Sequence, residues 1–131
     1  MITKIQNNPQ GEWKIEVPLP PSVNNAYLNA RKGRVQSQKT KKWYSIAKNS
    51  IFFSRSKYGD PRAISPPYLI VYELYRPDKR IRDCANYEKL LSDLLVKYEV
   101  ITDDSDIACN VQFWSEGEGE GVVGRIWSLA N

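Results

Sequence analysis

An unbroken apolar stripe runs through residues 84–98 and predicts an amphipathic helix. Its members, spaced three or four residues apart, are Cys84, Tyr87, Leu91, Leu94, Leu95 and Tyr98. Segments rich in aromatic and β-branched residues lie on both sides of it, at 68–75 and 107–114, and predict strands. Because such a helix must pack its stripe against a sheet, the pattern indicates the α/β (α+β) class.

The rest of the chain supplies two further strands and one more helix. Period-two alternation predicts a strand at 13–17, and Ser37 is the expected N-cap of a long helix that ends near Gly59. A last strand at 122–129 is expected to form a hairpin with 107–114 through the Glu/Gly segment 115–121. The expected order is β-α-β-α-β-β in one domain (1–131), a small mixed sheet with two helices, with residues 1–11 flexible. Core positions are expected at Trp13, Trp43, Ile46, Ala47, Ile51, Phe53, Tyr72, Tyr87 and Trp114.

Composition narrows the chemistry that is open to the chain. Nineteen Lys and Arg against fifteen Asp and Glu give a net charge of +4, which modestly favours a nucleic-acid partner. The chain has no histidine, which excludes a His general base, a Ser-His-Asp triad and His-ligated zinc. Cys84 and Cys109 have no metal-ligand spacing and are expected to be reduced packing residues. No stretch resembles a signal peptide or a membrane span, so a cytoplasmic location is expected.

Charged residues gather on both sides of the 84–98 helix. Arg76, Lys79, Arg80 and Arg82 directly precede Asp83, and three acids, Asp103, Asp104 and Asp106, follow the helix. Carboxylates that hold a divalent cation, beside cations that hold phosphates, are what phosphodiester hydrolysis requires. The purely structural interpretations are that Asp83 caps the helix and that 103–106 is a solvated turn. The residues alone leave both interpretations open.

The order of several motifs resembles the RusA-type Holliday junction resolvases. Pro20-Pro21-Ser22-Val23-Asn24 matches the family's PPSxN loop, and a basic turn and a long helix follow it. The later matching positions are Arg80, Arg82, Asp83, Asn86, Lys89, Asp93, Leu94 or Leu95, Ile101, Asp103, Asp104 and Ile107. The resemblance extends from about residue 13 to the C-terminus.

The resemblance implies a homodimeric endonuclease that resolves four-way junction DNA with Mg²⁺, or Mn²⁺, as cofactor. It implies that Asp83 and Asp104 are metal-binding catalytic residues and that Asp103 supports them. It implies that Lys89 contacts the scissile phosphate or stabilises developing charge. The DNA contacts that it implies are Asn24, Arg31, Lys32, Lys79, Arg80, Arg82 and Asn86. It also suggests a bacterial or phage-encoded protein, often carried by a prophage, with no membrane partner.

Ala85 departs from the family pattern, which has an aspartate two residues after Asp83. A methyl group cannot ligate Mg²⁺, and the nearest other acids are Glu88, Asp93 and Asp106. The chain is therefore an enzyme that recruits another acid, a nuclease-inactive junction-binding homologue, or an inactivated variant. An unrelated interaction domain with a solvated acidic turn is a further alternative.

Overall fold

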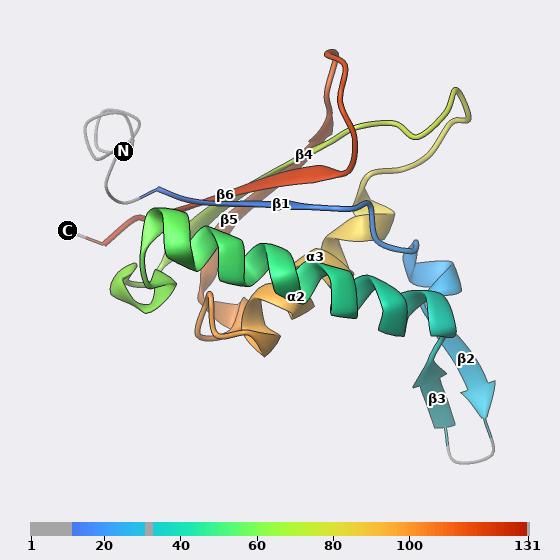
Figure 1. Cartoon of the computed structure of the whole chain (residues 1–131), viewed down its shortest axis with the longest axis horizontal. Helices are drawn as coiled ribbons and strands as arrows, with labels where there is room; N and C mark the ends of the chain where they lie inside the picture. The colour runs from blue at the N-terminus through green and yellow to red at the C-terminus, as the bar shows by residue number, and fades with distance from the viewer. Residues whose placement is uncertain (1–11, 31–32, 131) are drawn as a thin grey trace.

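The computed structural model describes residues 12–30 and 33–130, so the expectation for residues 1–11 lies outside the described part. Its main sheet has the strand order β1-β6-β4-β5 (Figure 1). The strands are β1 (Trp13–Val17), β4 (Tyr68–Leu74), β5 (Ile107–Trp114) and β6 (Val122–Ser128). The β4–β5 pair is parallel, whereas β6 is antiparallel to both β1 and β4. The predicted small mixed sheet and the α+β class are confirmed.

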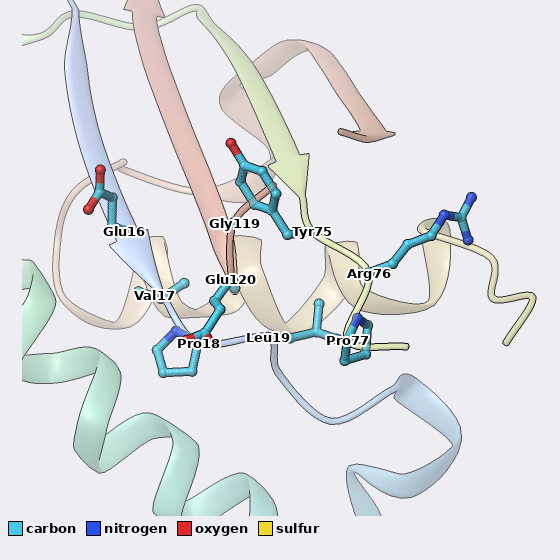
Figure 2. Close-up of a pocket in the computed structure, with 10 residues that line it drawn as sticks. Glu16, Val17, Pro18, Leu19, Tyr75, Arg76, Pro77, Gly119 and Glu120 are labelled. Carbon is cyan, nitrogen blue, oxygen red and sulfur yellow. The ribbon is translucent and has the colours of Figure 1, made fainter. Parts of the chain in front are cut away.

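The connection between β5 and β6 is not the hairpin that the sequence suggested. β6 pairs with β4 and β1 and does not pair with β5, so residues 115–121 cross the end of β4. Two backbone hydrogen bonds fix this crossing, Ser115 N–H to Leu74 O at 2.7 Å and Tyr75 N–H to Gly121 O at 2.9 Å. The expectation was wrong because β4 takes a strand partner on each edge, and β6 fills the second edge. Figure 2 shows the crossing segment beside Tyr75.

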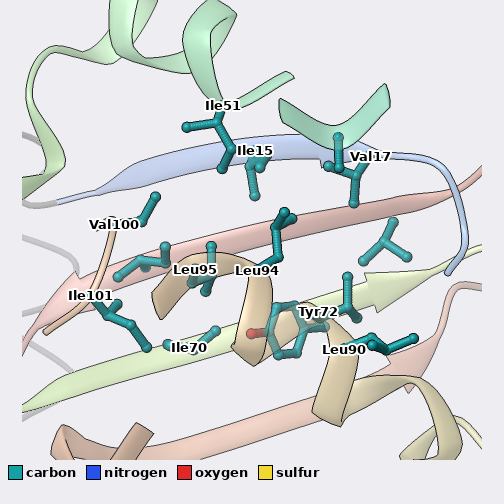
Figure 3. Packing of buried hydrophobic residues seen from close by; sticks show 14 of the residues in the cluster. Ile15, Val17, Ile51, Ile70, Tyr72, Leu90, Leu94, Leu95, Val100 and Ile101 are labelled. Carbon is teal, nitrogen blue, oxygen red and sulfur yellow. The ribbon is translucent and has the colours of Figure 1, made fainter. Parts of the chain in front are cut away.

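Two helices cover one face of the sheet. α2 (Gln38–Tyr58) begins at the predicted cap, where Ser37 Oγ accepts a hydrogen bond from Thr40 N–H at 3.2 Å. α3 (Ala85–Lys97) buries the predicted stripe against the inward side chains of β4 and β6 (Figure 3). Leu90, Leu94 and Leu95 are each 1% exposed, so each contributes about 1.5–3 kcal/mol to folding.

Some expected core positions are exposed. Trp43, Ala47 and Ile51 are buried on α2, but Ile46 is 43% exposed and Phe53 is 67% exposed. The buried side of α2 passes through Thr40, Trp43, Tyr44, Ala47, Ile51 and Ser54, and Ile46 and Phe53 lie off that line. The large hydrophobic side chains of α2 are therefore not a reliable guide to which side faces the sheet.

A second, two-stranded sheet was missed from the sequence. β2 (Tyr27–Ala30) pairs antiparallel with β3 (Gly33–Gln36) between the Pro-rich loop and α2. The sequence indicated only a basic turn there, and Arg31 and Lys32 at its tip lie outside the described residues. Short 3-10 turns complete the described chain at η2 (Val23–Asn25), η3 (Pro61–Ala63) and η4 (Asp104–Asp106).

Among residues 12–30 and 33–130, no helix covers the face of the sheet away from α2 and α3, called here the uncovered face. Alternation along β5 places Cys109, Val111 and Phe113 on that face, and Val111 and Phe113 are 42% and 40% exposed. Cys109 is exposed and not a packing residue as expected, because β5 is the edge strand and no described element covers its outer side. None of the helices among the described residues is long and apolar enough to span a membrane.

Candidate active site

The basic loop (residues 76–82) follows the end of β4 and is organised by an acid inside it. Asp78 accepts hydrogen bonds from Arg80 Nη2 at 3.3 Å and from Arg82 Nη2 at 2.9 Å. These guanidinium groups, Arg82 foremost, hold the pKa of Asp78 well below its usual range. Asp78 thus sets the spacing between Arg80 and Arg82, the two arginines that were predicted to contact DNA. The alternating positions of Asp78, Arg80 and Arg82 in the sequence were the signal that could have identified this role of Asp78.

Trp114, at the end of β5, anchors the basic loop to the fold. Its indole Nε1–H donates to the carbonyl oxygen of Arg82 at 3.0 Å, and the Arg76 guanidinium lies 4.7 Å from the centre of its ring. Its ring also meets Tyr87 of α3 edge to face, with 5.9 Å between ring centres. The tryptophan predicted as a core residue therefore also positions the basic loop. Lys79 is exposed in the same loop.

Asp83 stands at the junction of the basic loop and α3. One of its carboxylate oxygens accepts a hydrogen bond from Ala85 N–H at 3.0 Å, and its carbonyl accepts one from Asn86 N–H at 3.1 Å. Asp83 therefore forms a local turn just before the helix, whose N-cap residue is Cys84, and its exposed carboxylate also faces solvent. Ala85 is exposed in the first turn, and Asn86 is half-buried.

Lys89 and Asp93 form an ion pair along α3, with Lys89 Nζ 3.6 Å from Asp93 Oδ2. Asp93 also borders a hollow of about 320 Å³ that the acidic turn (residues 103–106) shares. The side chains around this hollow are Tyr44, Asp93, Val96, Lys97, Asp103 and Asp104. The structure thus brings Asp93 near two of the predicted site aspartates.

Local contacts shift the pKa values of two groups around this hollow. Ser105 Oγ–H donates to Asp103 at 2.6 Å, and this bond, followed by backbone N–H groups, lowers the pKa of Asp103. Burial raises the pKa of Tyr44, and the negative charge of Asp93 raises it further, so Tyr44 stays protonated. The hollow is therefore lined by carboxylates together with Tyr44 and Lys97, whose ammonium lies 4.6 Å from the centre of the Tyr44 ring.

The other two candidate substitute acids are already engaged. Glu88 accepts hydrogen bonds from Ser92 Oγ at 2.6 Å and from Asn110 Nδ2 at 2.7 Å, which ties α3 to β5. Asp106 accepts a hydrogen bond from Thr102 within its own turn. Of the three acids considered as replacements for an aspartate at position 85, Asp93 is the one that shares a hollow with Asp104.

The two halves of the predicted site lie at opposite ends of α3. Asp83 precedes the helix, and Asp104 follows it and borders its second half, so the length of the helix separates them, about 20 Å for 13 residues. The sheet gives the same result, because Arg82 contacts Trp114 at the end of β5 whereas Asp104 precedes its start. Eight residues of β5 span about 26 Å. One cation cannot touch both aspartates of the same chain.

The donor set of one chain accordingly does not fit a preformed Mg²⁺ site. Among residues 12–30 and 33–130, no three Asp, Glu, Cys or His side chains lie close enough together to hold a metal ion. At the Asp83 end of α3, the exposed position 85 carries a methyl group. The carboxylates of one chain are therefore too few at either end of α3 to hold a catalytic metal by themselves.

Of the remaining predicted DNA contacts, Asn24 lies in η2 and is followed by the β2–β3 hairpin. Figure 1 shows this hairpin and the basic loop at the same end of the molecule, beyond the C-terminal end of β4. Arg31 and Lys32 lie outside the described residues, so their predicted role stays a prediction.

Comparison with known families matches residues 18–123 to the family of endodeoxyribonuclease RusA. The chain belongs to the RusA family. The match includes the Pro-rich loop, both helices, the basic loop and the acidic turn, so the family assignment made on motifs is confirmed. Membership implies an endodeoxyribonuclease of the kind that resolves Holliday junctions. Comparison with curated proteins gave no match.

Proposed function

We propose that this RusA-family chain binds four-way junction DNA as a homodimer and cleaves its phosphodiester backbone with Mg²⁺ or Mn²⁺ as cofactor. The observation that carries the proposal is the family match over 18–123, which includes a basic loop that Trp114 and Asp78 hold beside Asp83. Arginines held in a fixed position suit phosphate groups, which they bind through charge-assisted hydrogen bonds. The proposed setting is the cytoplasm of a bacterium, with a bacterial or phage gene as its source.

Within this function, Arg80, Arg82 and Lys79 bind the phosphate backbone, and Asn86 and Asn24 contact the DNA beside them. Lys89 is 59% exposed and offers an ammonium group on the same helix as Asp83, where it can stabilise negative charge on a phosphate. Asp93 holds Lys89 until DNA arrives, because their ion pair is partly exposed and exchangeable.

The proposed second copy lies at the free edge of β5. Beside this edge, the uncovered sheet face carries the exposed apolar side chains of Val111 and Phe113. Exposed apolar patches beside an unpaired strand edge are typical of surfaces that associate. A two-fold axis at this edge would run the two β5 strands in opposite directions, so that the start of one lies beside the end of the other.

A homodimer also bears on the metal. Because Asp83 and Asp104 of one chain lie at opposite ends of α3, a cation that touches both must take Asp83 from one chain and Asp104 from the second copy. Mixing two inactive variants, Asp83→Asn and Asp104→Asn, tests this arrangement. A shared site predicts that mixed dimers regain one intact site, about a quarter of all sites after random exchange. Sites made within one chain predict no recovery.

A nuclease-inactive junction-binding protein is the second candidate, and a specific observation favours it. Position 85 is exposed in the first turn of α3 and is occupied by alanine, so the Asp83 end lacks a second carboxylate. The experiment compares cleavage of a labelled four-way junction by wild type and by Ala85→Asp, each with Mg²⁺ and with Mn²⁺. Cleavage by wild type supports the enzyme, and cleavage by Ala85→Asp alone supports the inactive homologue.

Two further results complete this test. Ala85→Asn is the matched control, because it adds a polar side chain of the same size without the charge that a cation needs. If neither wild type nor any variant distinguishes a four-way junction from a linear duplex, both candidates fail.

A further inference from the structure

A cavity of about 610 Å³ opens where β1 and β4 end and the 115–121 segment crosses between them (Figure 2). Its walls come from Glu16–Leu19, Tyr75–Pro77 and Gly119–Gly121. This volume lies within the usual range for sites that hold small organic groups. It adjoins the basic loop and is separate from the hollow beside the acidic turn, whose lining residues are different.

The glycines of the crossing segment shape this cavity. A Cβ atom at Gly119 would lie 2.6 Å from Cε1 of Tyr75, so only glycine allows the ring to pack against this backbone. Gly121 has φ +74°, and a Cβ there would lie 2.3 Å from the Val17 carbonyl oxygen. The backbone at Gly119 thus packs against the half-buried Tyr75 ring, and the backbone at Gly121 packs against the Val17 carbonyl group.

The chemistry of the walls is that of a site for a planar ring with hydrogen-bond donors. Tyr75, Pro18, Leu19 and Pro77 supply aromatic and apolar surface, and Figure 2 shows Leu19 next to Pro77. Glu16 and Glu120 supply carboxylates, of which Glu16 has a Lys14 ammonium 3.8 Å away. Carboxylates accept hydrogen bonds from exocyclic amino groups, such as those of cytosine and adenine.

One residue of the lining connects the cavity to the basic loop. Arg76 contributes to the lining, and its guanidinium extends away from the other lining residues (Figure 2) to lie 4.7 Å from the centre of the Trp114 ring on β5. A strand that continues from a base in the cavity would therefore pass Arg76 first, and then Arg80 and Arg82. The cavity and the loop together match one nucleotide and the strand that continues from it.

We propose that this cavity binds one unpaired nucleobase of branched DNA, with a preference for bases that carry an exocyclic amino group. The inference rests on the proposed junction binding, because a duplex keeps its bases stacked and a branch point can release one. Tyr75 stacks on the base, Glu120 accepts from its amino group, and Arg76 holds the phosphate.

The test measures binding of the full chain to three DNA probes by fluorescence anisotropy. The probes are a linear duplex, a fully paired four-way junction, and the same junction with one unpaired base at the crossover, supplied as adenine, cytosine or thymine. Stacking of one base predicts that wild type binds the junction with an unpaired adenine or cytosine about tenfold tighter than the paired junction. A fluorescent adenine analogue at the unpaired position should lose intensity when it stacks on Tyr75.

Two variants with controls localise the effect. Tyr75→Leu should remove most of the tenfold preference and leave binding of the paired junction unchanged, with circular dichroism to verify the fold. Glu120→Gln should weaken the preference for adenine and cytosine over thymine. Glu118→Gln, on the same segment but outside the cavity lining, should have no effect.

The outcomes separate this inference from the proposed function. If wild type prefers junction over duplex but binds paired and unpaired junctions equally, the cavity proposal is wrong and junction binding stands. If the unpaired base is preferred but Tyr75→Leu and Glu120→Gln leave that preference intact, the base binds elsewhere and the proposal is also wrong. Loss of any preference for a junction over a duplex overturns the proposed function itself.

Discussion

Replacing Asp78 with asparagine should tighten DNA binding and make it more dependent on salt. Asp78 is the acid within the basic loop, and it holds Arg80 and Arg82 by hydrogen bonds at 3.3 and 2.9 Å. The pKa of Asp78 lies well below its usual range because the guanidinium groups stabilise its charge, so the carboxylate stays ionised throughout the pH range of the binding assay. The variant therefore changes the loop's net charge by +1 at any pH from about 5 to 8.

The size of the effect follows from which arginine is released. The side chain of Arg80 is 79% exposed and can turn toward a phosphate, whereas that of Arg82 is 18% exposed and its backbone is held by Trp114. One additional phosphate contact is therefore expected. Each contact adds about 0.9 to the slope of log K against log salt, which corresponds to binding about eightfold tighter at 0.1 M salt and about fourfold tighter at 0.2 M.

The assay is a salt titration of junction binding by fluorescence anisotropy. Asp60→Asn is the matched control, because Asp60 makes the same kind of pair with Arg62 at 2.8 Å but precedes β4, at the other end of the sheet from the basic loop. If Asp60→Asn steepens the slope as much as Asp78→Asn does, the effect is one of net charge and the basic loop is not the DNA contact. An Asp78→Asn effect that disappears between pH 8 and pH 5 would contradict the low pKa of Asp78.

Two further predictions concern Trp114 and the uncovered face. Trp114→Phe removes the hydrogen bond to the Arg82 carbonyl and should lower the free energy of unfolding by about 1 kcal/mol in urea titrations, while junction affinity falls because the loop loses its anchor; unchanged junction affinity would mean that the loop is ordered without it. Val111→Lys places a charge on the uncovered face and should shift the proposed dimer toward monomer in sedimentation velocity. Ser56→Lys, at an exposed position of α2, is the control and should leave the sedimentation coefficient unchanged. Equal behaviour of the two variants would place the dimer contact elsewhere.

Local sequence signals predicted most of the elements, because each depends on neighbours in the chain. The Ser37 cap, the α3 stripe and the aromatic and β-branched segment that forms β4 were all confirmed to within a few residues. The pairing of β6 was not predictable in the same way, because 115–121 has the composition of a hairpin turn. Strand order depends on which edge of β4 remains open, and that information is spread over four strands.

The surroundings of the predicted site residues could not be predicted from the motifs. Asp83, Lys89 and Asp104 are predictions from the motif, and the residues near them come from other elements: Trp114 from β5, and Tyr44 from α2. Asp78 was overlooked because a single acid within a run of basic residues suggests only a lower net positive charge of that run. In the structure, that acid fixes the geometry of the run.

The two halves of the motif, at Asp83 and at the acidic turn, lie further apart in the structure than their arrangement around one helix in the sequence suggests. Acids that flank one helix look close in the sequence, but a helix of 13 residues keeps its two ends about 20 Å apart. The Asp83 end of α3 then adjoins the basic loop, and the acidic turn adjoins α2 through Tyr44. Each end is an incomplete set of ligands in one chain. Under the proposed function, the ligands missing at each end come from a second copy of the chain, so recovery of cleavage on mixing Asp83→Asn with Asp104→Asn is the result that would make association a requirement of catalysis.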